Sequence, residues 1–198
     1  MTTEIPASLP RLAPPGAGIP AIERIIGGAI FSLRRWRGSR EAFSEEFKRE
    51  RESIAQLCRG HGERTLSTRV LVPRLRGLED SSRHWSVYMT IDHLRIVNEQ
   101  IAIVIESLAR GLVPEGQASI ADVKPRPDIG PTVAPEYEVA CDRLLEMTAT
   151  SGDLRTPVRY AHPWFGPLDA LGWHSMASAH MGIHRAQIAR ILATGSKA

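Results

Sequence analysis

SAHMGIHRAQIARIL, residues 178–192, carries two histidines four residues apart in a largely apolar helical pattern. At about 100° per residue, His180 and His184 are about 40° apart around a helix, so both imidazoles share one face. The other residues on that face are mainly apolar: Trp173, Met176, Ile183, Gln187 and Ile191. Such a face is typical of a helix side that points into a protein core. We therefore expect both imidazoles to point inward.

The opposite face of the same helix carries small and polar residues: Ser178, Gly182, Arg185 and Ala189. Small side chains allow two helix backbones to approach closely. This face is therefore predicted to pack against another helix or a second subunit, and a homodimer is one expected assembly.

Helical patterns extend along most of the chain. Four long helices are expected at residues 39–58, 81–109, 136–150 and 168–193, with a shorter one at 19–36. The connections are an extended segment at 63–78, a proline-rich loop at 111–136 and a loop at 153–167. Four principal helices with one long crossover predict an all-α fold, a four-helix bundle with an additional N-terminal helix.

The composition favours one globular domain. The chain has 198 residues, of which 42% are hydrophobic and 24% charged. Residues 1–18 are rich in Pro, Ala and Gly and are predicted to form a disordered arm, which leaves 19–198 as a single bundle domain. No signal peptide or membrane span is indicated, so we expect a cytoplasmic protein. Cys58 and Cys141 lie far apart and are predicted to be buried free thiols.

The charge pattern gives little indication of a nucleic-acid partner. The formal net charge is only +3, and acidic and basic residues are mixed along most of the chain. The densest basic run, RRWRGSR at residues 34–40, includes Trp36 but is better explained as a solvated helix end. We predict no specific nucleic-acid binding.

A third histidine is expected to face inward from the helix predicted at 81–109. His93 shares a helix face with Ser86, Met89, Val97, Gln100 and Val104. Three imidazoles on two facing helices can converge on one divalent metal, which satisfies their ring nitrogens together. His93, His180 and His184 are therefore the predicted ligands. Nickel, zinc and ferrous iron all accept imidazole, and the spacing does not choose among them.

These histidines also have a simpler interpretation. A pair of histidines four residues apart arises by chance, and an inward histidine is often a hydrogen-bonded core residue. Three further histidines are predicted to lie at the surface: His61, His84 and His174. Two classes of function therefore stay open. One is a metal-dependent enzyme, and the other is a non-catalytic bundle that uses buried histidines for structure or partner binding.

His162 lies in the loop that enters the last helix. It can face the metal site as a proton donor or acceptor, which makes it the candidate catalytic residue. The alternative is a loop histidine that packs beside Pro163 and Trp164.

Other residues near the expected site have weaker indications. Asp92 points about 100° away from His93 around the helix, which favours an exposed carboxylate or one that supports a ligand over a ligand itself. Tyr160, Trp164 and Trp173 are candidates to line an apolar pocket, although aromatic residues at a helix entry are also common in cores.

Two segments resemble the DinB/YfiT-like superfamily of metal-binding four-helix bundles: WSVYMTIDHL, residues 85–94, and HPWFGPLDALGWHSMASAHMGIHRAQIARI, residues 162–191. The resemblance covers about residues 40–195 and rests on the histidine of the first segment, the final H-x-x-x-H and the glutamine after it. It implies His93, His180 and His184 as metal ligands, with Gln187 as a neighbour that is not a ligand. HPWFG is similar to a DinB-related subgroup of unassigned function.

The resemblance implies enzymes that transfer low-molecular-weight thiols to electrophiles, alongside maleylpyruvate isomerases. A metal held by three neutral histidines keeps its positive charge, so a thiol in an open position is deprotonated and becomes a nucleophile. Water in that position becomes a hydrolytic nucleophile instead. We therefore expect a divalent metal, a low-molecular-weight thiol as co-substrate and a small-molecule substrate, for a thiol S-transferase or a hydrolase.

Overall fold

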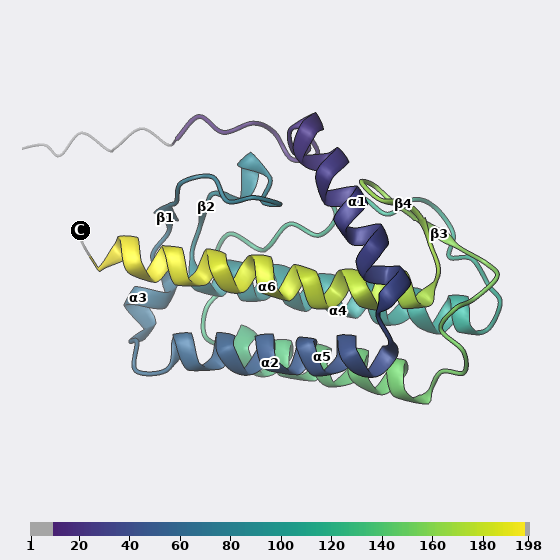
Figure 1. Ribbon diagram of the computed structural model, residues 1–198. Coiled ribbons are helices and arrows are strands. Elements are labelled where there is room, and N and C mark those ends of the chain that lie inside the picture. Colours follow the sequence, from purple (N-terminus) through teal and green to yellow (C-terminus); the bar gives the residue numbers. More distant parts are fainter. Residues whose placement is uncertain (1–9, 197–198) are drawn as a thin grey trace, which may run out of the picture.

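A computed structural model, which describes residues 10–196, confirms the all-α four-helix bundle. The four long helices are α2 (Arg40–Cys58), α4 (Val87–Ala109), α5 (Val133–Thr150) and α6 (Ala170–Gly195). Helix α4 packs against α5 and α6, and α2 packs against α6 and α5. The connection between α4 and α5 returns along the bundle, so these two helices run in the same direction (Figure 1). The predicted long crossover is therefore present.

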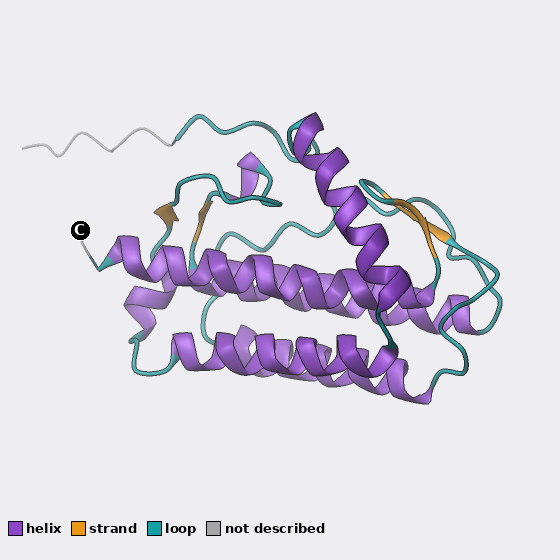
Figure 2. Ribbon diagram, viewed as in Figure 1, coloured by secondary structure: helices purple, strands orange, loops and turns teal. Residues whose placement is uncertain are grey.

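Short elements lie in two connections that were predicted to lack them (Figure 2). Helix α3 (Glu63–Ser67) and strand β1 (Val70–Leu71) lie in the segment expected to be extended, and β1 pairs antiparallel with β2 (His84–Trp85). Strands β3 (Tyr160–His162) and β4 (Gly166–Leu168) form an antiparallel hairpin in the loop before α6. Strands of two or three residues are too short to give a period-two pattern in the sequence.

Side-chain caps mark where three of the long helices begin, α2, α4 and α6, and the first two test the predicted starts most clearly. The Ser39 hydroxyl accepts a hydrogen bond from the Ala42 N–H at 3.2 Å, and α2 starts as predicted. The predicted start of α4 near residue 81 is wrong. The Ser86 hydroxyl accepts from the Met89 N–H at 3.1 Å, and the residues before it form a 3₁₀ turn, η1 (Asp80–Ser82), and strand β2.

The bundle interior is filled by aliphatic and aromatic side chains from all four long helices. Its largest fully buried residues include Phe47, Ile54, Leu94, Ile101, Ile105, Leu108, Leu144, Met181 and Ile188. Among the described residues, no helix is both long enough and apolar enough to cross a membrane.

The face of α6 with small residues packs against α2 of the same chain. Ser178 is fully buried, and the Arg185 guanidinium forms an ion pair with the Glu50 carboxylate of α2. The predicted close packing therefore has a partner helix within the chain. A homodimer stays a prediction.

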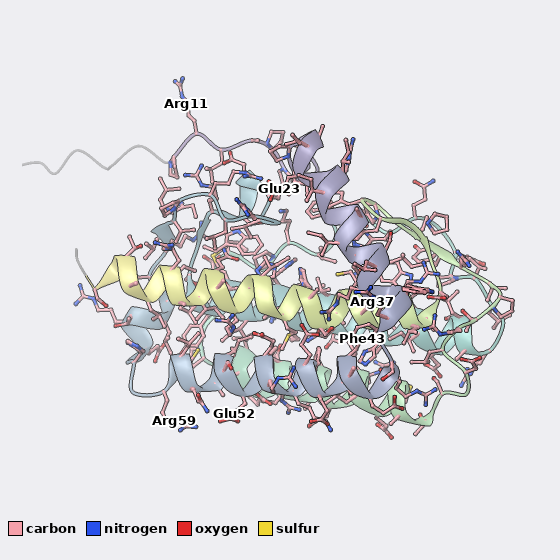
Figure 3. All side chains as sticks on the ribbon, in the orientation of Figure 1. Arg11, Glu23, Arg37, Phe43, Glu52 and Arg59 are labelled. Carbon is pink, nitrogen blue, oxygen red and sulfur yellow. The ribbon has the colours of Figure 1, made fainter. Side chains whose placement is uncertain are left out.

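Helix α1 (Ala21–Arg37) lies outside the bundle and crosses α6 obliquely (Figure 1). At its C-terminal end, Arg34 pairs with Glu46 and lies over the ring of Phe43, with 4.8 Å from the guanidinium carbon to the ring centroid. Figure 3 shows Phe43, on α2, near this end of α1, and Glu23 near the other end. Glu23 pairs with Arg74 in the β1–η1 connection. Both ends of α1 are thus anchored by ion pairs.

The segment before α1 has specific partners that its composition did not predict. The Ala13 N–H donates to the Asp80 carboxylate at 2.7 Å, and the Gly16 and Gly18 N–H groups donate to Glu79 at 2.9 and 3.0 Å. Glu79 is buried, with an exposed fraction of 3%. Residues 1–9 of the predicted arm lie outside the described residues, and the domain limits stay a prediction.

The predicted burial of two residues needs correction. His174 was predicted to be exposed but is fully buried between α6 and α2, where its Nε2 lies 3.0 Å from the Ser44 hydroxyl and 3.3 Å from the Arg40 carbonyl. Helix α6 is covered on several sides, so pointing away from one face does not expose a residue. Both cysteines are free thiols, but Cys58 is only half-buried. Burial raises the pKa of Cys58 to about 11 and that of Cys141 to about 12.

The burial of His174 predicts an acid-sensitive contribution to stability. Burial lowers the pKa of His174 from 6.5 to about 4, so between these values the unfolded chain takes up a proton that the folded chain does not. Stability is therefore lost as pH falls through this window, by about 3 kcal/mol between pH 7 and pH 4 from this residue. In urea unfolding at several pH values, His174→Gln should flatten the profile by that amount, whereas the exposed His61→Gln should leave it unchanged. Parallel profiles for His174→Gln and the parent would contradict this assignment.

Candidate metal centre

The structure brings His93, His180 and His184 together, as predicted. One potential ligand atom from each ring lies within 4.8 Å of the other two. The Nε2 atom of His180 lies 3.2 Å from Nε2 of His93 and 3.0 Å from Nε2 of His184. Nitrogens that share a tetrahedral zinc at about 2.05 Å are about 3.3 Å apart. The three rings, hereafter the histidine cluster, are therefore close enough to hold one metal ion.

Hydrogen bonds to oxygen acceptors decide which nitrogen of two rings carries the proton. Nδ1 of His93 lies 2.6 Å from the Val123 carbonyl oxygen, which only accepts, so Nδ1 donates. Nδ1 of His184 lies 2.7 Å from Oε1 of Gln187 and donates to it. In a neutral imidazole the other nitrogen then carries a lone pair. Both Nε2 atoms therefore present lone pairs to the centre of the cluster.

The third ring cannot satisfy both of these lone pairs. His180 lies between the two Nε2 atoms, and a proton on its own Nε2 can be directed at only one of them at a time. Its Nδ1 is buried and has no hydrogen-bond partner among the described residues. At least one lone pair in the cluster is thus left without a donor, which is costly in a buried site. A cation among the three Nε2 atoms would remove this cost, so the donor set fits a metal.

The environment keeps the cluster neutral, the form that binds metal. Burial lowers the pKa of His93 to about 4. Burial also holds the pKa of His180 and His184 well below the usual range, and the neighbouring rings of the cluster lower it further. All three lone pairs are therefore available at neutral pH.

Gln187 fixes the orientation of the His184 ring. Its side-chain NH₂ donates to the Ser82 carbonyl at 2.7 Å, which turns its Oε1 toward His184. Gln187 is itself fully buried. Gln187 therefore contacts the edge of the His184 ring that faces away from His180.

Asp92 holds the segment that supports His93. It is fully buried and not exposed, and it accepts hydrogen bonds from Arg95 at 3.0 Å and from the backbone N–H of Arg126 at 2.9 Å. Burial alone would raise the pKa of Asp92, but the bonds from Arg126 and Arg95 outweigh it and lower the pKa. Arg126 follows Val123 closely in the chain, so Asp92 helps to fix the carbonyl that orients the His93 ring.

Trp85 packs beside the cluster from strand β2. Its ring centroid lies 5.1 Å from that of His93 and 6.1 Å from that of His184. The Lys124 ammonium lies 5.4 Å from the centroid of the Trp85 ring. The same ammonium forms an ion pair with the Glu79 carboxylate at 2.8 Å. Trp85 is 4% exposed, so it shields the cluster from water on this side. Sequence reasoning did not find Trp85, Lys124 or Glu79 because they come from short or irregular segments.

A cavity of about 920 Å³ opens over the histidine cluster. Its walls come from α1, residues 74–82, α4, residues 117–124, the β3–β4 hairpin and α6. The predicted aromatic residues Tyr160, Trp164 and Trp173 all line it. A volume of this size accommodates a small-molecule ligand. We refer to it below as the apolar cavity, because aliphatic and aromatic side chains form most of its wall.

His162 also lines this cavity, from strand β3. Its Nδ1 accepts hydrogen bonds from the N–H groups of Trp164 at 3.1 Å and Phe165 at 3.4 Å. The proton of the neutral ring is therefore on Nε2. Burial lowers the pKa of His162 to about 4, so at neutral pH this ring is a hydrogen-bond donor and not a cation.

Comparison with solved structures identifies the fold. A crystal structure of TT2238, described as a four-helix bundle protein, matches with a TM-score of 0.54 and 23% identity. The match covers 75% of this chain and 96% of that one. The chain shares its fold with this bundle protein. No protein-family model matches the chain, and no curated protein matches it, so membership of the DinB/YfiT-like superfamily stays a prediction.

The role of Gln187 gives a direct test of the site. Gln187→Ala removes the acceptor that directs the His184 proton to Nδ1, so Zn²⁺ affinity should fall about 10- to 100-fold. Gln100→Ala is the matched control, since Gln100 lines the apolar cavity but is not among the residues hydrogen-bonded to the cluster. Zn²⁺ titration by calorimetry measures both. Equal affinities for Gln187→Ala and Gln100→Ala would show that Gln187 does not support the ligand.

Proposed function

We propose that this protein is a metal-dependent enzyme that transfers a low-molecular-weight thiol to an electrophilic small molecule. The observation that carries the proposal is the convergence of three neutral Nε2 atoms at the floor of a large cavity. Three protein ligands are the number found in catalytic sites that leave a position for substrate. A purely structural site would instead be closed by four protein ligands.

The charge of the donor set favours a thiol. Histidines contribute no negative charge, so a divalent metal, when bound, supplies an undiminished positive charge that lowers the pKa of a thiol and provides thiolate at neutral pH. A free thiol has a pKa of about 8.5 and water about 15.7, so a thiol needs a much smaller shift. The site therefore needs a smaller pKa shift to activate a thiol than to activate water, which is the competing nucleophile.

Two of the three carboxylates that line the cavity, Glu79 and Glu23, are engaged in other interactions. Glu79 pairs with Lys124, and Glu23 pairs with Arg74. These contacts lower the pKa of both carboxyl groups although burial opposes them. Neither is a strong general base, so the water pathway has little help from these two carboxylates.

His162 is suited to activate the electrophile. Its Nε2–H is the hydrogen-bond donor of a neutral ring on the cavity wall. In the proposed transfer, the sulfur electron pair forms the new bond to the electrophile, and the atom that leaves takes the bonding electrons. His162 stabilises the negative charge on that atom by hydrogen bonding, and the thiol proton is released to solvent.

Cobalt-substituted protein separates the proposed function from its alternatives. Dithiothreitol or glutathione should give a sulfur-to-cobalt charge-transfer absorption with the parent, and none with His180→Ala. The exposed His61→Ala is the control and should behave as the parent. Cobalt binding without any thiol signal would contradict thiol activation and favour water as the nucleophile. Failure to bind cobalt would contradict the enzyme and favour a non-catalytic bundle.

A further inference from the structure

Helix α1 presents a row of aliphatic side chains to the apolar cavity. Ile22, Ile26 and Ile30 line it at intervals of four residues. They remain 70%, 55% and 64% exposed. The row extends about 12 Å along the helix axis. A contiguous apolar surface of this kind typically marks a binding site, because covering it removes apolar area from water.

The facing wall of the cavity is apolar as well. Val97, Ile101 and Val104 line it from α4, and Met176 and Ile183 line it from α6. A ligand that lies along α1 therefore meets aliphatic side chains on both sides. Polar side chains also line the cavity, among them Arg74, Arg76 and Gln117, but the surfaces contributed by these three helices suit an aliphatic body.

The floor of the cavity has a different character. The histidine cluster lies there and contributes no negative charge, so a divalent cation held by it attracts an anion. Lys124 and Glu79 beside the cluster form an ion pair at 2.8 Å and offset each other. An anionic group is therefore favoured at the cluster, and an ammonium group is disfavoured.

We infer that the substrate of this site is a medium-chain aliphatic molecule with one anionic head group, a thiolate or a carboxylate. The head lies at the histidine cluster, and an aliphatic body of about ten carbons lies along Ile22, Ile26 and Ile30. The position of the head rests on the proposed function. The position of the aliphatic body rests only on the cavity wall.

Helix α1 offers a matched pair of variants for the test. Ile26 lines the cavity, whereas the neighbouring Ile25 does not and is 71% exposed. Ile26→Ser and Ile25→Ser therefore make the same chemical change on and off the proposed binding surface. Because both side chains are largely exposed, neither change removes core packing, and circular dichroism checks that both variants fold.

The experiment is a calorimetric titration of the full chain, loaded with zinc, with sodium decanoate. Ile26→Ser should weaken decanoate binding about five- to tenfold, since about half of an isoleucine side chain loses its contact. Ile25→Ser should bind within about twofold of the parent. Butyrate, which has the same head and a short body, and decyltrimethylammonium, which has the opposite charge, should both bind at least tenfold more weakly.

Each half of the inference can fail separately. Equal binding of decanoate to Ile26→Ser and Ile25→Ser would contradict the proposed position of the aliphatic body along α1. Equal binding of decanoate and decyltrimethylammonium would contradict an anionic head group at the cluster. Equal binding of decanoate to zinc-loaded and chelator-treated protein would contradict it as well. Zinc content is measured in the same samples. A chain that retains no zinc would contradict the proposed function. In that case the comparison of Ile26→Ser with Ile25→Ser in chelator-treated protein still tests the position of the aliphatic body.

Discussion

The site depends on two hydrogen bonds that fix protons on Nδ1 of His93 and His184. The acceptors, the Val123 carbonyl and the Gln187 amide oxygen, cannot donate in return. The Nε2 lone pairs of both rings are therefore forced toward His180. Without these two bonds the rings could exchange protons among themselves and behave as a hydrogen-bonded core. With them, the cluster holds more lone pairs than protons, which is the condition that favours a cation.

The supporting contacts join segments that are distant in the chain. Gln187 links α6 to the Ser82 carbonyl in η1, and Asp92 links α4 to the backbone of Arg126 in the long crossover. Residues of the same segments, Ser82, Val123 and Lys124, also line the cavity. A change that loosens the crossover should therefore disturb the orientation of the His93 ring through the Val123 carbonyl.

Much of this arrangement follows from helical periodicity. His180 and His184 lie on one face of α6, and His93 lies on the face of α4 that carries Val97 and Val104, so their convergence was predictable. The same reasoning failed where a helix is covered on more than one side. His174 points away from the cluster and yet is fully buried, and Asp92 is buried too, which contradicts the exposed one of its two predicted roles. Periodicity identifies one buried face, but it does not show whether a connection or another helix covers the opposite one.

The cavity could not be predicted, because its walls come from separate segments. The sequence indicated helix α1, but nothing in it placed Ile22, Ile26 and Ile30 opposite α4 and α6. The tautomer of His162 could not be predicted either, since it depends on two N–H groups in the β3–β4 turn. Short strands and backbone hydrogen-bond acceptors do not require particular residue types, so the sequence does not reveal them. They supply the orientation that the predicted ligands need.

Anomalous diffraction from crystals of protein purified without chelator tests the central claim most directly. Data collected on either side of the zinc, nickel and iron absorption edges locate and identify any such ion. The structure predicts one peak per chain, about 2.0–2.1 Å from the Nε2 atoms of His93, His180 and His184 if the metal is zinc. Crystals soaked in zinc that show no peak among these three rings, or a peak only elsewhere, would contradict the metal centre.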